Sequence, residues 1–512
     1  MKMGSPGAQQ LRDFIEKTRI HQERDAFIAS IREEQVCNLA SSHRRGDRCI
    51  CFKPPVRGSY NICFFVKFDN GEKWVVRIPL SPCLAFGAKS KLESEIATML
   101  LISERTSIPI PHIIAYRLDD DPNPLSSFLI LEYIEGHKLS YRNIRTLSDA
   151  QRDRLYRSLA AIYIQLRRLE FPSVGCLRSH EDGPKVSKMV TSIDINIQEL
   201  EGLNPSVIQA SYTNQHGTLT SASAYTSMLL QLADNAFAKS RCSVTDDEEQ
   251  GADALYHLDI FRKFVGDWVD HSLDNGPFVL VHGDLEPFNL LVDDEMGVVC
   301  VLDWEWSRIV PLQFFKPPLW LANPDPTNLA FEVVYRRYLE RFDKFLAILR
   351  TLEKERYGNE LLSNEWAGAK MNSGFLVANA LENWTDIDWF AFRYINWKCY
   401  KGKDLQERVR AFMDEDITRK AFITRKLREG IAYTAAVETL KNNSEDDVSV
   451  EPDSARYLYA GSAPTESDPS SKFWRAIASA TIFADGQTAL GCGMLLILGV
   501  SYLVGHRLLR RS

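Results

Sequence analysis

Alternating apolar and polar positions predict a small antiparallel sheet in the first third of the chain. Residues 60–68 (YNICFFVKF) and 73–78 (KWVVRI) are rich in β-branched and aromatic side chains, and the intervening DNGE is typical of a β-hairpin. Residues 88–105 carry apolar positions at helical spacing, and two further predicted strands come after them at 112–117 and 128–133. This order predicts an antiparallel sheet that carries one helix.

Helical patterns flank this lobe, which we assign to residues 49–135. Residues 1–48 are predicted to form a charged helical extension with apolar positions at helical spacing. Residues 136–440 predict a mainly helical second lobe, in which a long amphipathic helix at 148–170 has a Ser or Asp cap. Residues 206–252 are polar, with Ser/Thr runs and a DDEE segment, and are interpreted as an insertion or mobile loop.

The end of the chain suggests a membrane anchor. Residues 441–485 are acidic and rich in Ser and Pro, as disordered linkers are. Residues 489–504 are uncharged and almost wholly apolar, although a spanning helix normally needs about 20 such residues. The alternative is a buried core helix. We expect residues 486–506 to form a hydrophobic tail helix that contacts an intracellular membrane as a transmembrane anchor, with the catalytic domain in the cytoplasm.

Composition excludes some classes of function. A net charge of −7 gives no support for nucleic-acid binding, which usually requires a basic surface. The ten cysteines are scattered without paired zinc spacing, so reduced thiols are the expected state. The first residues lack the apolar core of a signal peptide.

The stretch 279–303 (VLVHGDLEPFNLLVDDEMGVVCVLD) carries the candidate chemistry. His282, Asp284, Asn289 and Asp303 punctuate short apolar segments that are typical of strands. Asp284 is placed to orient a hydroxyl group, whereas Asn289 and Asp303 supply the oxygen ligands that Mg²⁺ prefers. The alternative is a solvated turn in which Asp and Asn only cap loops.

These residues resemble a known family. HGDLEPFNLLVD followed by VLDWE is similar to the catalytic motif and the metal-binding aspartate of the aminoglycoside phosphotransferase and choline kinase group, and LDWEWSRIVPLQFFKPPLWL resembles its fungal branch of unassigned substrate. The resemblance covers residues 58–440. It implies an α+β, two-lobed protein-kinase-like fold, with His282 and Asp284 as catalytic residues, Mg²⁺ as cofactor and ATP as co-substrate.

The resemblance also assigns a phosphate-holding pair in the first lobe. Family members carry a basic residue on the third strand that pairs with a helix glutamate, and the matching positions are Arg77 and Glu95. Arginine departs from the usual lysine, but its fork can bind phosphate and carboxylate together. The alternative is that Arg77 lies on the surface and Glu95 pairs with Lys91 one helical turn away.

Two further segments are expected to contact the nucleotide. The backbone amides of Gly58 and Ser59, in the turn RGSYN, could face phosphate, although a single glycine more often marks only a turn. Glu132, Tyr133 and Ile134, in LILEYIEG, match the connection between lobes whose backbone would hydrogen-bond a purine. A plain buried strand end is the alternative there.

Acceptor recognition is assigned to aromatic and acidic residues after the metal aspartate. Trp304, Glu305 and Trp306 come directly after Asp303, and residues 384–397 (WTDIDWFAFRYINW) are similar in character. Such walls can hold a cation, because an aromatic face attracts positive charge. More often, an aromatic run of this kind is helix core.

We therefore predict an ATP-dependent (or GTP-dependent) phosphotransferase that modifies a hydroxyl of a small molecule. Asp303 is followed by Trp-Glu instead of Phe-Gly, which makes a protein substrate the less favoured choice. The alternative is a membrane-tethered pseudokinase or scaffold that binds nucleotide without turnover. The expected partners are a nucleotide and a small hydroxylated acceptor, and no nucleic acid.

Overall fold

The computed structural model describes residues 12–443 except 182, 214–216 and 323–325. These residues belong to one compact unit, Met1–Glu451. The predicted tail helix at 486–506, and all but the first three residues of the predicted linker at 441–485, lie outside the described residues. Within the described part of the chain, no helix is long and apolar enough to cross a membrane.

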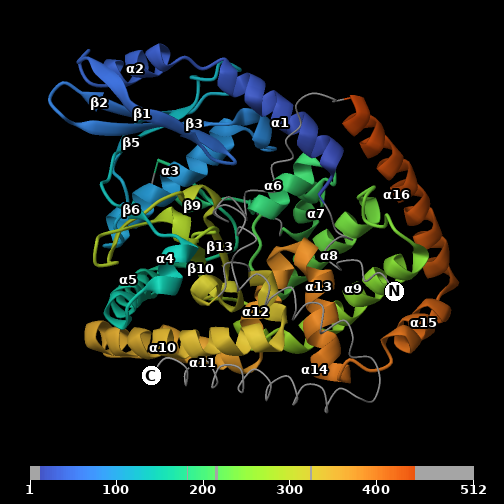
Figure 1. The fold of residues 1–512 in the computed structure, drawn as a ribbon. Coiled ribbons are helices and arrows are strands. Elements are labelled where there is room, and N and C mark those ends of the chain that lie inside the picture. The colour runs from blue at the N-terminus through green and yellow to red at the C-terminus, as the bar shows by residue number, and fades with distance from the viewer. Residues whose placement is uncertain (1–11, 182, 214–216, 323–325, 444–512) are drawn as a thin grey trace, which may run out of the picture. The chain divides into compact units, whose positions relative to one another are not determined.

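The N-terminal lobe is built on a five-stranded antiparallel sheet (Figure 1). Its strands, in spatial order, are β1 (Cys49–Arg57), β2 (Asn61–Phe68), β3 (Lys73–Pro79), β5 (Phe128–Glu132) and β4 (Ile113–Arg117). The predicted hairpin is formed by β2 and β3, and the register places Arg77 on β3 opposite Cys63 on β2. The predicted antiparallel sheet is therefore confirmed.

Three helices accompany the sheet. They are α1 (Phe14–Ala29) and α2 (Glu33–Ser42) in the N-terminal extension, and α3 (Ala88–Arg105) between β3 and β4. Val36 and Ala40 of α2 are fully buried in one apolar cluster with the sheet, because they lie four residues apart on one face of the helix. The inner face of α3 contacts the segment Trp304–Trp306, directly after the predicted metal aspartate.

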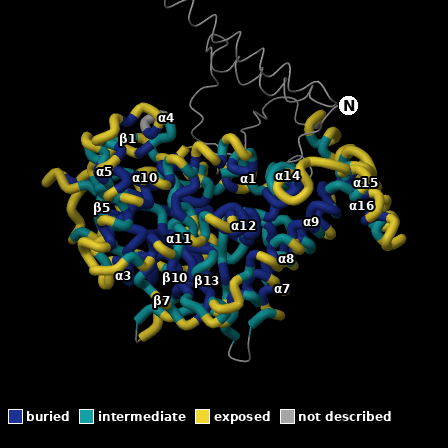
Figure 2. Tube along the Cα trace, turned by 90° about the horizontal axis from the view of Figure 1, so that it is seen from below, coloured by how far each residue is buried: buried dark blue, intermediate teal, exposed yellow. Residues whose placement is uncertain are grey.

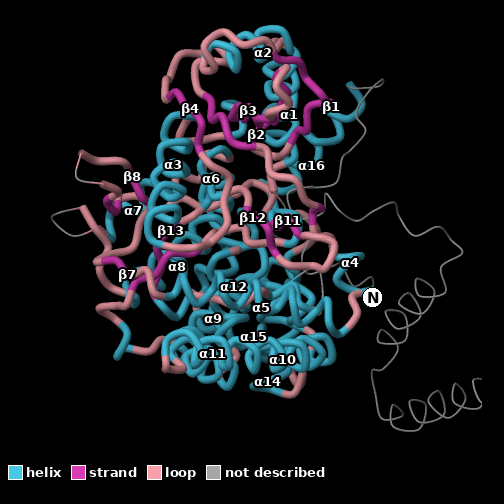
Figure 3. The backbone as a smooth tube through the Cα atoms, turned by 90° about the vertical axis from the view of Figure 1, so that its left-hand side faces the viewer, coloured by secondary structure: helices cyan, strands magenta, loops and turns pink. Residues whose placement is uncertain are grey.

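The second lobe is mainly helical, as predicted (Figure 3). Its first long helix, α5, begins after Ser148, whose side chain forms a capping box with Gln151. The helices are α4 (Tyr141–Thr146), α5 (Asp149–Arg167), α6 (Ile193–Leu200), α7 (Pro205–Tyr212), α8 (Ala222–Lys239), α9 (Glu248–Trp268), α10 (Glu332–Tyr357), α11 (Leu361–Met371), α12 (Gly374–Glu382), α13 (Ile387–Phe390), α14 (Asn396–Tyr400), α15 (Leu405–Glu415) and α16 (Ile417–Asn443).

The prediction of an irregular insertion at 206–252 is wrong for most of that segment. It contains most of α7, all of α8 and the start of α9. Tyr225, Leu229 and Leu232 of α8 recur at helical spacing and are buried in the main core. Figure 2 shows buried positions in the interior and exposed positions along outer helices such as α15.

Two small sheets place the segments that carry the candidate chemistry. The first contains β13 (Arg308–Pro311), β10 (Phe278–Val281) and β7 (Glu170–Phe171), and the second contains β12 (Val298–Val301), β11 (Leu290–Val292) and β6 (His137–Lys138). A separate pair, β8 (Leu177–Arg178) and β9 (Lys185–Val186), lies apart from them. The loop after β10 and the end of β12 are joined by hydrogen bonds through Leu302.

Candidate active site

The loop between β10 and β11 is held in one conformation by its glycine. Gly283 has a φ of +84°, a region that favours glycine. A Cβ atom built at this position would lie 2.0 Å from the carbonyl oxygen of Trp306. The two segments can therefore approach this closely only with glycine at position 283.

Gly283→Ala is expected to destabilise the fold by about 2–5 kcal/mol, which combines left-handed backbone strain with the displacement of a neighbouring segment. The matched control is Gly266→Ala on α9, where a Cβ meets nothing within 4 Å. That control should be neutral, or more stable by up to about 1 kcal/mol, because alanine favours helix. Chemical denaturation of both variants measures the difference, and equal stabilities would contradict the argument.

The surroundings of His282 favour a positioning role over the catalytic role that the resemblance implied. Its ring is buried, with Nε2 donating to the carbonyl of Leu302 at 2.8 Å and Nδ1 accepting from the Asp284 N–H at 3.3 Å. Burial lowers the pKa of His282 to about 4, so the ring is neutral near pH 7. Both nitrogens are occupied by backbone groups, and the side chain therefore fixes the loop instead of exchanging protons with a substrate.

The buried ring of His282 also predicts how stability depends on pH. Its folded pKa of about 4 lies below the ordinary histidine value of 6.5, so the unfolded chain takes up the proton first as pH falls. Stability is complete above pH 6.5 and declines between pH 6.5 and 4, by an amount on the order of 3 kcal/mol. His282→Asn should flatten this part of the stability curve in denaturation at stepped pH, whereas an unchanged curve would contradict the assignment.

Asp284, Asn289 and Asp303 come together as the sequence predicts. The amide nitrogen of Asn289 donates to the Asp284 carboxylate at 3.1 Å and to its backbone carbonyl at 2.8 Å. The Leu302 N–H donates to the carbonyl of Asn289 at 2.8 Å, which sets the place of Asp303 directly after it. Burial, and then the charges of Glu286 and Asp303, raise the pKa of Asp284.

Arg77 and Glu95 form the predicted ion pair. The Nη1 atom of Arg77 lies 2.5 Å from Glu95, and both side chains are buried. Its Nη2 atom bonds the carboxylate of Asp303. Arg77 is only 6% exposed, which excludes the alternative of a surface arginine. Lys91 also lies 4.0 Å from Glu95, so the local contact exists beside the Arg77–Glu95 pair.

Oxygen donors of Asn289 and Asp303 lie where a divalent cation would be held, although the Arg77 guanidinium bonds Asp303. Among the described residues, no group of three or more His, Cys, Asp or Glu side chains is placed to hold a metal ion. Two buried cations, Arg77 and Lys91, face three carboxylates, Glu95, Asp303 and Glu305, so this cluster carries a formal charge of −1. Because the amide nitrogen of Asn289 donates to Asp284, the oxygen of Asn289 remains as a ligand. Hard oxygen donors with net negative charge are the set that Mg²⁺ prefers.

Several amides predicted to contact the nucleotide are engaged within the protein, which contradicts the predicted phosphate contact of the Gly58 amide. The Gly58 N–H donates to the Asn61 carbonyl at 2.8 Å, which closes the turn between β1 and β2 and leaves Ser59 at its tip. The amides of Glu132 and Tyr133 bond His112 and Lys73 within the sheet. The purine contact assigned to Glu132, Tyr133 and Ile134 stays a prediction.

Trp304, Glu305 and Trp306 do not form an acceptor wall. Their exposures are 1%, 4% and 4%, so they offer no surface to a substrate. The Trp304 indole nitrogen donates to the Val301 carbonyl at 3.1 Å, and its ring centroid lies 4.6 Å from that of His282. These residues pack the chemistry-bearing loop from behind, which corrects the predicted substrate role.

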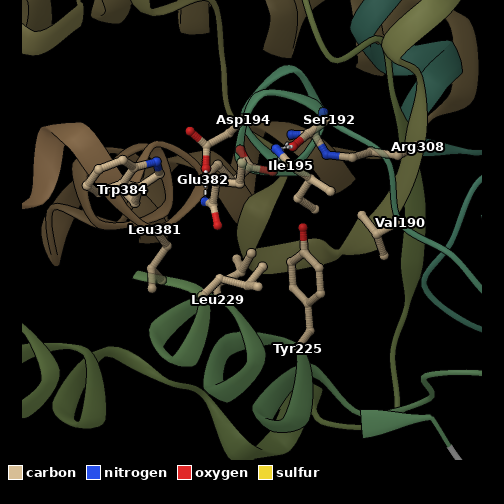
Figure 4. A pocket seen from close by; sticks show the side chains of 12 residues that line it. Val190, Ser192, Asp194, Ile195, Tyr225, Leu229, Arg308, Leu381, Glu382 and Trp384 are labelled. Carbon is tan, nitrogen blue, oxygen red and sulfur yellow. Dashed lines mark hydrogen bonds and ion pairs between the residues drawn. The ribbon is translucent and has the colours of Figure 1, made fainter. Parts of the chain in front are cut away.

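Figure 4 shows a small pocket that Arg308 lines. Arg308 connects this pocket to the segment 304–306, because its Nη1 donates to the Trp306 carbonyl at 3.4 Å and its Nη2 lies 2.5 Å from Glu382, which also lines the pocket. About 10 Å³ is open to the centre of a water-sized sphere, so the pocket holds about one water molecule. It is lined by Asp194, Gln198, Tyr225, Arg308, Glu382 and Trp384, among others.

The aromatic run 384–397 is largely helix core. Trp384, Asp386 and Asp388 are buried, and Trp384 lines the small pocket described above. Trp397, which lies on α14, is 59% exposed. The alternative of helix core is therefore favoured for this run.

Comparison with known sequences agrees with the geometry. Residues 52–314, about half of the chain, match the sequence model of the phosphotransferase enzyme family. A subtelomeric hrmA-associated cluster protein of Aspergillus fumigatus is 27% identical over 137 residues, which are 27% of this chain and 26% of the relative. Altered inheritance of mitochondria protein 9, mitochondrial, of Candida dubliniensis is 20% identical over 318 residues, or 56% of this chain and 45% of the relative. The chain thus spans about a quarter to a half of these relatives.

Solved structures are more distant. The GDP complex of aminoglycoside 2′-phosphotransferase-IIIa is 14% identical with a TM-score of 0.38, and it covers 76% of this chain and 99% of its own. Macrolide 2′-phosphotransferase type I is also 14% identical, with a TM-score of 0.35 and coverages of 74% and 95%.

Proposed function

Because the chain belongs to the phosphotransferase enzyme family, we propose that it transfers the γ-phosphoryl group of ATP or GTP to a hydroxyl of a small molecule. The observation that carries this proposal is the convergence of Asp284, Asn289 and Asp303 beside the Arg77–Glu95 pair. Phosphoryl transfer requires a group that orients the hydroxyl, oxygen ligands for metal, and a cation for the phosphates.

Each residue has a distinct role in this proposal. Asp284 accepts the proton of the acceptor hydroxyl and holds its oxygen in line with the γ-phosphorus. Asn289 and Asp303 would hold Mg²⁺, which when bound would neutralise charge on the phosphate oxygens. Arg77, oriented by Glu95, presents its Nη2 to the phosphates after leaving Asp303.

The segment after Asp303 favours a small acceptor over a protein. Residues 304–311 are buried, and Arg308–Pro311 pairs as β13 with β10. A kinase that acts on proteins needs an activation segment that can be ordered or released. Here that part of the chain is core, so it presents no platform for a peptide.

One contact favours a second candidate, a nucleotide-binding scaffold without turnover. Arg77 bonds Asp303 directly, so a cation already occupies the carboxylate that would hold metal. If nucleotide binding does not displace Arg77, transfer cannot proceed through Asp303.

Transfer from labelled nucleotide distinguishes the two candidates. The purified protein is incubated with Mg²⁺, γ-³²P-labelled ATP or GTP, and a panel of hydroxylated metabolites. The proposed enzyme gives a labelled product with the wild type and with an exposed-residue control, Asp294→Asn, but not with Asp284→Asn. Nucleotide binding without any product above the Asp284→Asn background would favour the scaffold.

The location of the protein is a separate proposal. The yeast relatives carry "mitochondrial" in their names, so we propose mitochondria, in place of the cytoplasm, as the compartment of this chain. The membrane tail at 486–506 stays a prediction. Cell fractionation of the full chain and of a form lacking 486–512 tests both: a tail anchor predicts release from the membrane pellet only in the shortened form, and absence from mitochondria contradicts the proposed compartment.

A further inference from the structure

Glu305 lies where four segments meet. Its carboxylate accepts from the Asn61 amide nitrogen at 2.6 Å, bonds the Lys91 ammonium, and lies 3.1 Å from the Nη2 atom of Arg77. Asn61 begins β2 at the end of the turn over the predicted phosphate site, Lys91 is on α3, and Arg77 is on β3. Glu305 itself is two residues beyond the metal aspartate. One carboxylate therefore joins the turn, the helix, the sheet and the metal loop.

A second contact ties the same two segments together. The ring of Tyr60, in the turn, meets the ring of Trp306 edge-on with centroids 4.7 Å apart. Lys91 also donates to the Asn61 side-chain oxygen at 2.8 Å. The turn thus contacts the 304–306 segment twice, through the Asn61–Glu305 hydrogen bond and through the packing of Tyr60 on Trp306.

Burial makes these contacts interdependent. Asn61, Lys91 and Glu305 are all less than 9% exposed. Removing one member leaves another buried without its partner, which costs more than the contact contributes in the intact set. The set is therefore expected to form or break as one unit.

We propose that Glu305, with Lys91 and Asn61, is a positioning residue that clamps the turn at 57–61 against the metal loop before nucleotide binds. The inference rests on the proposed function, since it treats this turn as the phosphate cover. Neither Glu305 nor Lys91 touches the reacting atoms. A cover that is already ordered lowers the entropic cost of binding nucleotide, so the clamp acts on affinity for nucleotide more than on the transfer step.

Two amides, one in the turn and one directly after β3, report on the clamp. The Gly58 N–H is bonded to Asn61 within the turn, and the Leu80 N–H is bonded to the Tyr60 carbonyl at its edge, both at 2.8 Å. Hydrogen exchange of these amides in the nucleotide-free protein measures the clamp directly. Glu305→Gln, which keeps the shape and removes the charge, should speed their exchange at least tenfold.

Milder variants keep the test decisive if Glu305→Gln does not fold. Asn61→Ala keeps the Lys91 and Glu305 side chains that bond each other and removes the side chain that links them to the turn, so it should speed exchange of the same two amides. Lys91→Met should do likewise, while Lys89→Met, an exposed neighbour on α3, should not. Glu305→Asp, which restores the charge on a shorter side chain, should recover part of the protection.

Affinity for Mg·ADP, measured by calorimetry, provides the second readout. The clamp predicts a Kd raised about tenfold in Glu305→Gln and Asn61→Ala, with no additive loss in the double variant. If the clamp variants exchange faster but the wild type does not bind nucleotide, the clamp is retained and the proposed function is rejected. Normal nucleotide binding with unchanged exchange in all three clamp variants would reject the clamp.

Discussion

Asp284→Asn is expected to lower kcat for phosphoryl transfer by about 10²–10⁴-fold, the range for removing a positioned proton acceptor. The amide is nearly isosteric, and its oxygen can still accept from Asn289, which lies 3.1 Å from the carboxylate in the wild type. Nucleotide affinity should therefore change by no more than about threefold, because the uncharged group loses only its ability to take the hydroxyl proton.

The surroundings of Asp284 support this expectation. Burial and three neighbouring carboxylates, Glu286, Asp303 and Glu305, raise the pKa of Asp284, which brings a weakly basic carboxylate closer to the basicity that proton transfer needs. Steady-state kinetics separates kcat from KM, and Asp294→Asn is the control because its side chain is 94% exposed. A variant with unchanged kcat and altered KM would assign Asp284 to binding instead.

Local signals were sufficient for much of the N-terminal lobe. The DNGE turn between two β-rich runs predicts β2 and β3, and the helical spacing over 88–105 matches α3 residue for residue. The Arg77–Glu95 pair came from resemblance, because the third strand and the helix after it are fixed parts of that fold. Their 2.5 Å separation bears out the predicted proximity.

Long-range contacts explain what the sequence did not predict. Glu305 meets Asn61 across 244 residues, and no local pattern distinguishes such a buried acid from one that faces a substrate. Lys91 was considered only as a local partner of Glu95, four residues away. Arg308 and Glu382, which support the loop from the pocket side, carry no motif at all.

The helices within residues 206–252 are hidden from composition for a related reason. The Ser/Thr runs and acidic stretch of this segment are typical of a loop by composition, although α8 carries buried apolar positions at helical spacing. Ser221 caps α8 by accepting from the Ala224 N–H, so one of these serines begins a helix instead of a loop.

Asp303→Asn is expected to abolish detectable transfer, by about 10³-fold or more, through loss of the metal. The same change should have little effect on folding. Arg77 retains Glu95 and Glu305 as partners, and the formal charge of the cluster changes from −1 to zero. The free energy of unfolding should shift by less than about 1 kcal/mol.

Because Asp303→Asn should remove transfer and leave the fold intact, this variant distinguishes the enzyme from the scaffold. In the enzyme, nucleotide draws Arg77 away from Asp303. Mn²⁺, used as a probe for Mg²⁺, then binds the protein·ADP complex with an affinity that Asp303→Asn removes. In the scaffold, Arg77 stays on Asp303, so electron paramagnetic resonance finds the same weak Mn²⁺ binding with and without the substitution. Since denaturation should show both proteins equally folded, a difference in Mn²⁺ affinity can be attributed to the Asp303 carboxylate itself.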